Sequence, residues 1–267
     1  QNVLVDNGLD TAEITFGTNL MSPQLVVDIG RSNKMFKVER PGNSMREFYR
    51  SSTHLSDYIR NTLLEKGSSV WIAQRNGRTK DGVDRTDTGV IKMVAMSRTD
   101  DALASIDELN IVPVAVSYEW EPCDAAKATE LWRRSQGPYE KRPGEDLQSI
   151  LSGILAPKGR VHFHICTPLA SEELAAICDR SVNVFHKRVA ELIDKRIHGA
   201  YRLFSNNYIA HDILHGNSDY AGFYTADEEA AFKARLDELS HLDCFCDDMR
   251  RIFLGIYANP VDSKGRV

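Results

Sequence analysis

The chain has 267 residues, of which 42% are hydrophobic, and its formal net charge is −5 at pH 7. This length and composition allow a sizeable buried core, so we expect one large domain or one domain with an appendage. No apolar run approaches the roughly 18 to 20 residues of a membrane span, and the overall acidity argues against a nucleic-acid-binding protein.

The first 170 residues alternate helical and strand patterns. Apolar positions at helical spacing predict helices at residues 1–7, 44–66, 89–97, 101–109, 125–134 and 146–155. Short apolar or alternating segments predict strands at residues 25–28, 35–38, 69–73, 111–117 and 160–166. Ser44 and Glu47 form a capping-box pattern at the start of the 44–66 helix. This order favours an α/β domain over residues 1–170, with a mostly parallel sheet flanked by helices.

The character changes after residue 170. Residues 171–197 are expected to form one long amphipathic helix, Thr225 and Glu228 cap a second, and an apolar stripe from Leu242 to Ile256 predicts a third. The last residues, 259–267, look like a loose tail. Residues 171–267 are therefore expected to be a C-terminal all-helical appendage.

The five cysteines indicate the compartment. Five is an odd number at low density, which is typical of a reducing cytoplasm rather than of a disulfide scaffold. The chain starts with Gln1 and shows no signal-peptide pattern, so we expect a processed or trimmed product that is located in the cytoplasm. The cysteines are Cys123, Cys166, Cys178, Cys244 and Cys246.

Residues 70–93 hold an apolar strand that opens into a basic, glycine-containing loop. Glycines let a backbone approach a ligand closely, and Arg and Lys supply charge-assisted donors, so the loop is suited to hold an anion such as phosphate. Residues 31–95 contain 13 Lys and Arg against 7 Asp and Glu, a surplus of +6 that leaves −11 for the remainder. A solvated basic face is the alternative explanation. The loop residues in question are Arg75, Gly77, Arg78, Lys80, Gly82 and Arg85.

Four segments appear in an order that is informative as a whole. Residues 36–40 are an aromatic-containing strand that ends in Arg40, and residues 76–82 read Asn-Gly-Arg-Thr-Lys-Asp-Gly after an apolar strand. Residues 112–114 read Val-Pro-Val and lead to Tyr118 and Glu119, and residues 161–169 read VHFHICTPL. Over residues 10–170 this order resembles the glycerophospholipid acyltransferase superfamily, which includes glycerol-3-phosphate and lysophosphatidate acyltransferases.

The chain departs from this family in two places. The family's first block, His-x-x-x-x-Asp, does not occur in these 267 residues. We expect the pair to lie upstream of Gln1; the competing interpretation is a divergent member that never had it. In addition, Asn76 stands where the third block usually has Glu, and the loop spacing differs by about one residue.

The resemblance implies a reaction and a set of contacts. A fatty acyl group would pass from acyl-CoA or acyl-carrier protein to a hydroxyl of glycerol-3-phosphate or a lysophospholipid, with the family's His as general base and its Asp orienting that His. Arg40, Gly77, Arg78 and Lys80 would bind the acceptor's phosphate, and Val112, Pro113 and Val114 would line the acyl side. The thioester is already activated, so no metal or organic cofactor is expected. The resemblance also implies peripheral contact with the inner membrane face, and a nucleic-acid partner is not expected.

Two other functions stay open. One is a catalytically silent relative that binds a phospholipid or an acyl-carrier protein; the other is a sugar-phosphate or nucleotide enzyme with an unrelated α/β fold. Metal ligation by His162 and His164, or by the cysteines near His241, is disfavoured because matching ligands are absent at suitable spacing. The acyl chain length, the acyl donor, the acceptor, the role of the helical region and the oligomeric state are left open.

Overall fold

A computed structural model describes residues 2–17, 24–38, 44–75, 77, 79–140, 144–242 and 244–266. Its contacts divide the chain into two compact units. Unit 1 comprises Gln1–Asn76, Arg85–Val112 and Pro168–Ile193, and unit 2 comprises Gly77–Asp84, Pro113–Thr167 and Asp194–Val267. Each unit takes residues from both sides of residue 170, and the domain boundary expected there stays a prediction.

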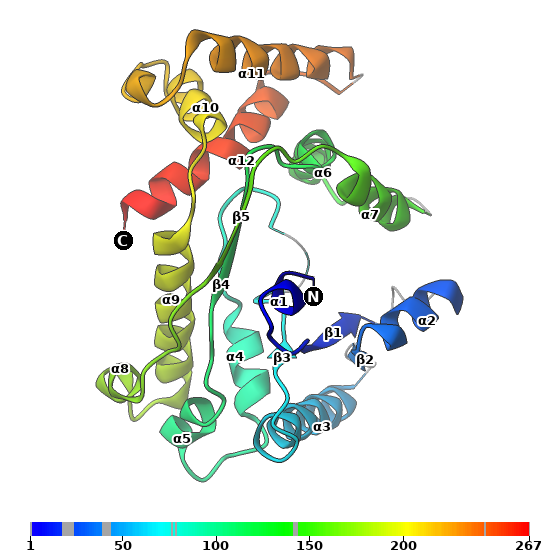
Figure 1. Ribbon diagram of the computed structural model, residues 1–267, viewed down its shortest axis with the longest axis vertical. Coiled ribbons are helices and arrows are strands. Elements are labelled where there is room, and N and C mark those ends of the chain that lie inside the picture. Colours follow the sequence, from blue (N-terminus) through cyan, green and yellow to red (C-terminus); the bar gives the residue numbers. More distant parts are fainter. Residues whose placement is uncertain are drawn as a thin grey trace. The chain divides into compact units, whose positions relative to one another are not determined.

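Unit 1 contains a small parallel sheet. Its strand order is β2-β1-β3, with Ile14 opposite Met35 on one side and opposite Trp71 on the other. Figure 1 shows the three strands together with α3, whose first turn is capped where Ser44 Oγ accepts from the backbone N–H of Glu47 at 3.2 Å. The elements are α1 (Asn2–Asp6), β1 (Glu13–Gly17), α2 (Gln24–Ser32), β2 (Met35–Val38), α3 (Met45–Leu64), β3 (Val70–Trp71), α4 (Thr88–Ala95), α5 (Ala102–Asp107), α8 (Ser171–Ile177) and the first part of α9 (Val182–Ala200).

The structure of unit 1 departs from the sequence predictions in three places. Residues 25–28 belong to helix α2 rather than to a strand, because a short apolar run does not distinguish the two by periodicity alone. Strand β1 was not anticipated. The single helix expected over 171–197 is two helices: Asp179 accepts a hydrogen bond from Ser181 N at 2.9 Å and pairs with Arg188, which starts α9 anew.

Unit 2 combines a two-stranded sheet with helices. β4 and β5 pair antiparallel, with Val116 opposite Phe163, so this pair does not extend the parallel sheet that the sequence predicted. Both strands lie where they were expected. The elements are β4 (Val114–Tyr118), α6 (Asp124–Gln136), α7 (Glu145–Leu155), β5 (Val161–Ile165), the end of α9, α10 (Ser205–His215), η2 (Ala221–Phe223), α11 (Ala226–Glu238), η3 (Leu239–His241) and α12 (Asp247–Gly265).

The C-terminal region is helical, as expected: no strand follows Ile165 in the described residues. Thr225 caps α11 as the sequence indicated, with its Oγ1 accepting from Glu228 N at 3.2 Å. Helix α10 was not anticipated, and the loose tail expected from residue 259 is wrong. α12 continues to Gly265 because Val261 and Ser263 remain buried beyond Pro260.

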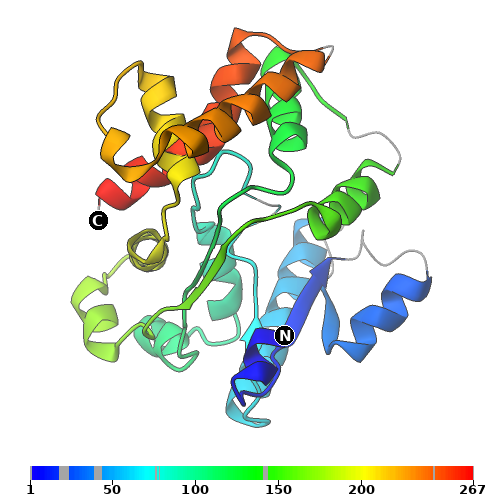
Figure 2. The same ribbon diagram turned by 45° about the horizontal axis from the view of Figure 1, so that its top comes forward.

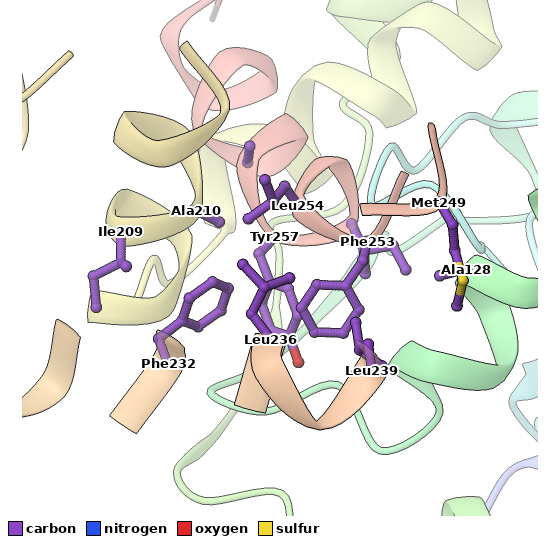
Figure 3. Close-up of a cluster of buried hydrophobic side chains, with 12 residues drawn as sticks. Ala128, Ile209, Ala210, Phe232, Leu236, Leu239, Met249, Phe253, Leu254 and Tyr257 are labelled. Carbon is purple, nitrogen blue, oxygen red and sulfur yellow. The ribbon is translucent and has the colours of Figure 1, made fainter. Parts of the chain in front are cut away.

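The core of unit 2 lies among its helices. Figures 1 and 2 both show α10, α11 and α12 together, and Figure 3 shows the rings of Phe232, Phe253 and Tyr257 gathered there. Phe232 and Tyr257 meet edge to face with centroids 5.3 Å apart, a favourable arrangement for aromatic rings. The Asp124 carboxylate, 1% exposed, accepts from Tyr257 OH at 2.8 Å and from Arg235 Nη2 at 2.5 Å, so this buried charge is paired.

Candidate functional site

The glycine loop, residues 77–84, is fixed on α12 within unit 2. Gly77 and Gly82 have φ of +78° and +74°, a left-handed conformation that glycine adopts readily. A Cβ added at Gly82 would lie 2.9 Å from the carbonyl carbon of Ile256 and closer still to its oxygen. Asn259 Nδ2 donates to the carbonyl oxygen of Asp81 at 2.7 Å. The loop therefore rests directly on the helix backbone, at a place where only glycine fits.

The end of the loop is held by a polar network around Asp84. Tyr201 OH donates to Asp84 Oδ2 at 2.8 Å and Thr79 Oγ1 donates to Oδ1 at 2.5 Å, while His198 Nε2 lies 2.7 Å from the Asp84 carbonyl oxygen. Burial, and then the negative charge of Asp84, raise the pKa of Tyr201 well above its usual range. The Tyr201 hydroxyl therefore keeps its proton and remains a hydrogen-bond donor to Asp84. Its bond and that of Thr79 hold residues 79–84 in a turn.

Lys80 lies in the same loop and forms an ion pair with Glu130 of α6. The Glu130 side chain is 9% exposed and also pairs with Arg134, whose Nη2 is 2.7 Å from Glu130 Oε1. The pair with Glu130 fixes the position of the Lys80 side chain, so less of its conformational entropy remains to be lost if a ligand binds there.

The structure brings together some of the expected site residues. Gly77 is exposed with open space beside it, and Lys80 is three residues further in the same loop. Arg40 and Arg78 lie outside the described residues. Of the further cations near the loop, Arg75 and Arg85 belong to unit 1.

The residues expected to line the acyl side lie at the entry to β4. Val112 is 38% exposed, Pro113 is buried and Val114 begins the strand. The Pro113 carbonyl accepts from Cys166 N at 2.9 Å, which continues the pairing with β5 beyond the strand end. These three consecutive residues thus lie at the start of β4, and their role in lining the acyl side of the site stays a prediction.

Glu119, which directly follows β4, makes hydrogen bonds that stabilise the fold. Its carboxylate accepts from Arg160 N at 2.7 Å and from Arg160 Nη2 at 2.8 Å, and its carbonyl accepts from Asn206 Nδ2 at 2.6 Å. Hydrogen bonding from the Arg160 side chain lowers the pKa of Glu119, so the carboxylate stays ionised. These contacts join the β4–β5 pair to the start of α10.

Helix α7 presents an apolar face to solvent. Leu147 is 51% exposed, Ile154 67% and Leu155 79%, and a shallow groove runs along Leu147, Leu151 and Leu155. Contiguous exposed apolar surface of this kind is typical of a contact site for a protein or a lipid.

Sequence reasoning missed His211, His215 and Asp262, which the structure brings together in unit 2. The available signal was the His-x-x-x-His spacing of residues 211–215, which has meaning only once a helix is assigned there. His162 and His164, considered from the sequence, stack with ring centroids 5.8 Å apart on β5. Asp243, beside the cysteines near His241, lies outside the described residues.

Comparison with known proteins returned no matching family model, no matching curated protein and no matching solved structure. Within the described ranges, no helix combines the length and the apolar character needed to cross a bilayer.

Proposed function

We propose that this protein transfers a fatty acyl group from acyl-CoA or acyl-carrier protein to a hydroxyl of glycerol-3-phosphate or a lysophospholipid. The observation that carries the proposal is the glycine loop: it follows strand β3, turns at two glycines in the left-handed conformation, and holds Lys80 in place beside Glu130 and Arg134. The order of the four sequence segments agrees with it. The three parallel strands of unit 1 agree in part with the mostly parallel sheet that the order of elements predicts, whereas β4 and β5 form a separate antiparallel pair.

Gly77, Arg78 and Lys80, with Arg40, would bind the acceptor's phosphate. Gly77 leaves room for a ligand to approach the backbone, since no atom of the described residues lies within 4 Å of the position that a Cβ would take. The planar guanidinium of Arg78 suits two phosphate oxygens, and the Lys80 ammonium adds a point charge. Fixing the phosphate fixes the distance between the acceptor hydroxyl and the thioester, which is a large part of catalysis when two substrates react.

The chemistry needs a general base near the acceptor hydroxyl. A His held by an Asp would remove the hydroxyl proton as the oxygen attacks the thioester carbonyl, and would return that proton to the departing thiolate. The thioester bond breaks as the ester bond forms, so the reaction needs no oxidant or reductant. Val112, Pro113 and Val114 would contact the acyl chain.

Contact with a membrane surface would be peripheral and would use α7. Its exposed Leu147, Ile154 and Leu155 are suited to enter the interfacial layer of a bilayer, as amphipathic helices do. Placement at the inner membrane face would bring the site to lysophospholipid substrates.

The test is an acyl-transfer assay on the full-length encoded protein, with glycerol-3-phosphate or lysophosphatidate as acceptor and acyl-CoA or acyl-carrier-protein thioester as donor. Arg78→Ala and Lys80→Ala are each compared with Lys187→Ala, which removes an exposed cation from a surface pair with Glu191. We expect KM for the acceptor to rise at least about tenfold in the first two variants, since a hydrogen bond to a charged group contributes about 1.5 to 3 kcal/mol. An equal KM for the acceptor in all three variants would exclude contacts between the acceptor's phosphate and Arg78 or Lys80.

A catalytically silent relative is the second candidate, favoured by the absence of His-x-x-x-x-Asp from these residues. Such a protein would bind lysophosphatidate or acyl-carrier protein without turnover. Binding of lysophosphatidate that is weakened in Arg78→Ala, with no acyl transfer from any donor, would support this candidate over the enzyme.

A further inference from the structure

Two histidines and one aspartate gather on one side of unit 2. His211 and His215 are four residues apart on α10, so they project from the same face of the helix. Asp262 reaches them from α12, which packs along α10 as Figures 1 and 2 both show. One potential ligand atom from each of the three side chains lies within 4.8 Å of the other two.

The distances are compatible with a metal ion. His211 Nε2 is 3.3 Å from Asp262 Oδ1, at the long end of the range for an N–H···O bond. A tetrahedral zinc ion with its N and O ligands at about 2.1 Å holds neighbouring ligand atoms about 3.4 Å apart. The His211 and His215 rings are 4.3 Å apart between centroids, so a small rotation of the exposed His215 side chain completes the set.

His211 is poorly satisfied by the rest of the protein. Its side chain is 12% exposed, and its Nδ1 is buried with no hydrogen-bond partner in the described residues. Tyr220 packs edge-on against the ring at 4.9 Å and fixes its orientation. A buried polar ring with one long contact is costly to the fold unless something else binds it. A cation bound by Nε2 and Asp262 would give the ring a stronger partner than this long contact, while Nδ1 would keep its surroundings.

We propose that His211, His215 and Asp262 bind a divalent transition-metal ion, for which zinc is the best fit, with the fourth position open to water. Two imidazoles and one carboxylate form a ligand set typical of zinc, whereas calcium and magnesium prefer oxygen ligands. The site opens to solvent, since His215 is exposed and the Asp262 side chain is 41% exposed. This proposal departs from the absence of a metal site that the sequence led us to expect.

The metal site is independent of the proposed acyl transfer. Its ligands lie in residues 211–262, beyond the segment that resembles the acyltransferases. An ion at this position joins α10 to α12 and therefore stabilises the native state of unit 2 whenever it is bound. Because His ligands bind a metal only in the deprotonated form, metal affinity should weaken as the pH is lowered.

The test is a zinc titration of the full chain at pH 7.5 by calorimetry, with thermal unfolding recorded with and without zinc. His215→Ala is the main variant, because this exposed residue at the end of α10 can change without disturbing the core. His164→Ala is the matched control, since His164 sits beside another histidine on β5 but has no carboxylate in the same group. Asp262→Asn tests the third ligand, and Co²⁺ absorption reports the coordination geometry.

We expect one zinc ion per chain, a rise in Tm on binding, and an affinity at least about tenfold weaker in His215→Ala and Asp262→Asn, since even outer-shell changes weaken metal sites by this much. His164→Ala is expected to bind as the unmodified chain does. The proposal would be overturned if the unmodified chain bound zinc with a Kd above about 10 μM. It would also be overturned if His215→Ala and His164→Ala bound zinc with equal affinity.

Discussion

Substitution of Gly82 by alanine tests how the glycine loop is held. The new Cβ would lie 2.9 Å from the carbonyl carbon of Ile256, closer than real Cβ atoms approach other atoms, so the loop or the helix must move. Gly77 provides the control: its φ of +78° is nearly the same as the +74° of Gly82, but an added Cβ would have no atom within 4 Å in the part of the chain that the structure describes. The two substitutions therefore share the backbone strain and differ only in the close approach.

The free energies follow from the structure. A left-handed alanine costs about 1 to 2 kcal/mol, partly offset by about 0.4 to 1 kcal/mol from the stiffer unfolded chain, so Gly77→Ala should lower the free energy of unfolding by about 1 kcal/mol. If the loop lifts from α12 in Gly82→Ala, the Asn259–Asp81 and Tyr201–Asp84 hydrogen bonds are lost as well. At about 1 kcal/mol for each bond, the total cost is about 3 kcal/mol.

Urea unfolding, followed by circular dichroism, measures the difference between these variants. We expect Gly82→Ala to unfold at a clearly lower urea concentration than Gly77→Ala, with the same slope against urea if only the native state is affected. Equal midpoints for the two variants would refute the reasoning, because they would show that the loop does not rest on the α12 backbone. In the acyl-transfer assay, Gly82→Ala should also raise KM for the acceptor, since Lys80 moves with the loop.

Three further predictions concern stability and are each read by urea unfolding. Phe253→Ala, at a side chain with 0% exposure in the core of unit 2, should cost about 3 to 5 kcal/mol, and a loss below about 1 kcal/mol would contradict the packing shown in Figure 3. Tyr257→Phe keeps the ring but removes the hydroxyl that donates to Asp124 and accepts from Glu121 N, and should cost about 1 to 3 kcal/mol; no change would show that these bonds contribute little. Burial, with a smaller contribution from Lys92, lowers the pKa of His186, so the folded state favours the neutral ring. The contribution of this residue to the free energy of unfolding is complete above the unfolded-state pKa of about 6.5. It declines as the pH falls below that value, by up to about 1.4 kcal/mol per pH unit. His186→Leu should unfold with a weaker dependence on pH between 7 and 5, and an unchanged dependence would exclude His186 as its source.

The sequence predicted features that depend on neighbouring residues. The caps at Ser44 and Thr225 were found because each signal is complete within four residues. The strand over 25–28 was wrong because its apolar run is short enough to fit a helix turn as well, and the tail after residue 259 was wrong because buried positions that far along α12 depend on packing against other helices.

For the candidate site, the loop and its glycines could be located from sequence, but its contacts could not. Lys80 meets Glu130, and Gly82 meets Ile256, across long stretches of intervening chain that no local pattern links. The same holds for Asp262, whose nearness to His211 follows only from the packing of α12 on α10. Sequence periodicity identifies which face of a helix is apolar, and leaves open which partner covers it.

The long separation between the glycine loop and α12 has a consequence for synthesis on the ribosome. Residues 77–84 emerge long before the backbone on which they rest, since 178 residues separate Asp81 from its partner Asn259. Contacts this distant in sequence form slowly, because the loop must close before they can stabilise the fold. Unit 2 is therefore complete only once α12 has been made. A nascent chain that ends before residue 247 would expose the apolar surfaces that Phe253 and Tyr257 cover, and such exposed surfaces are bound by chaperones.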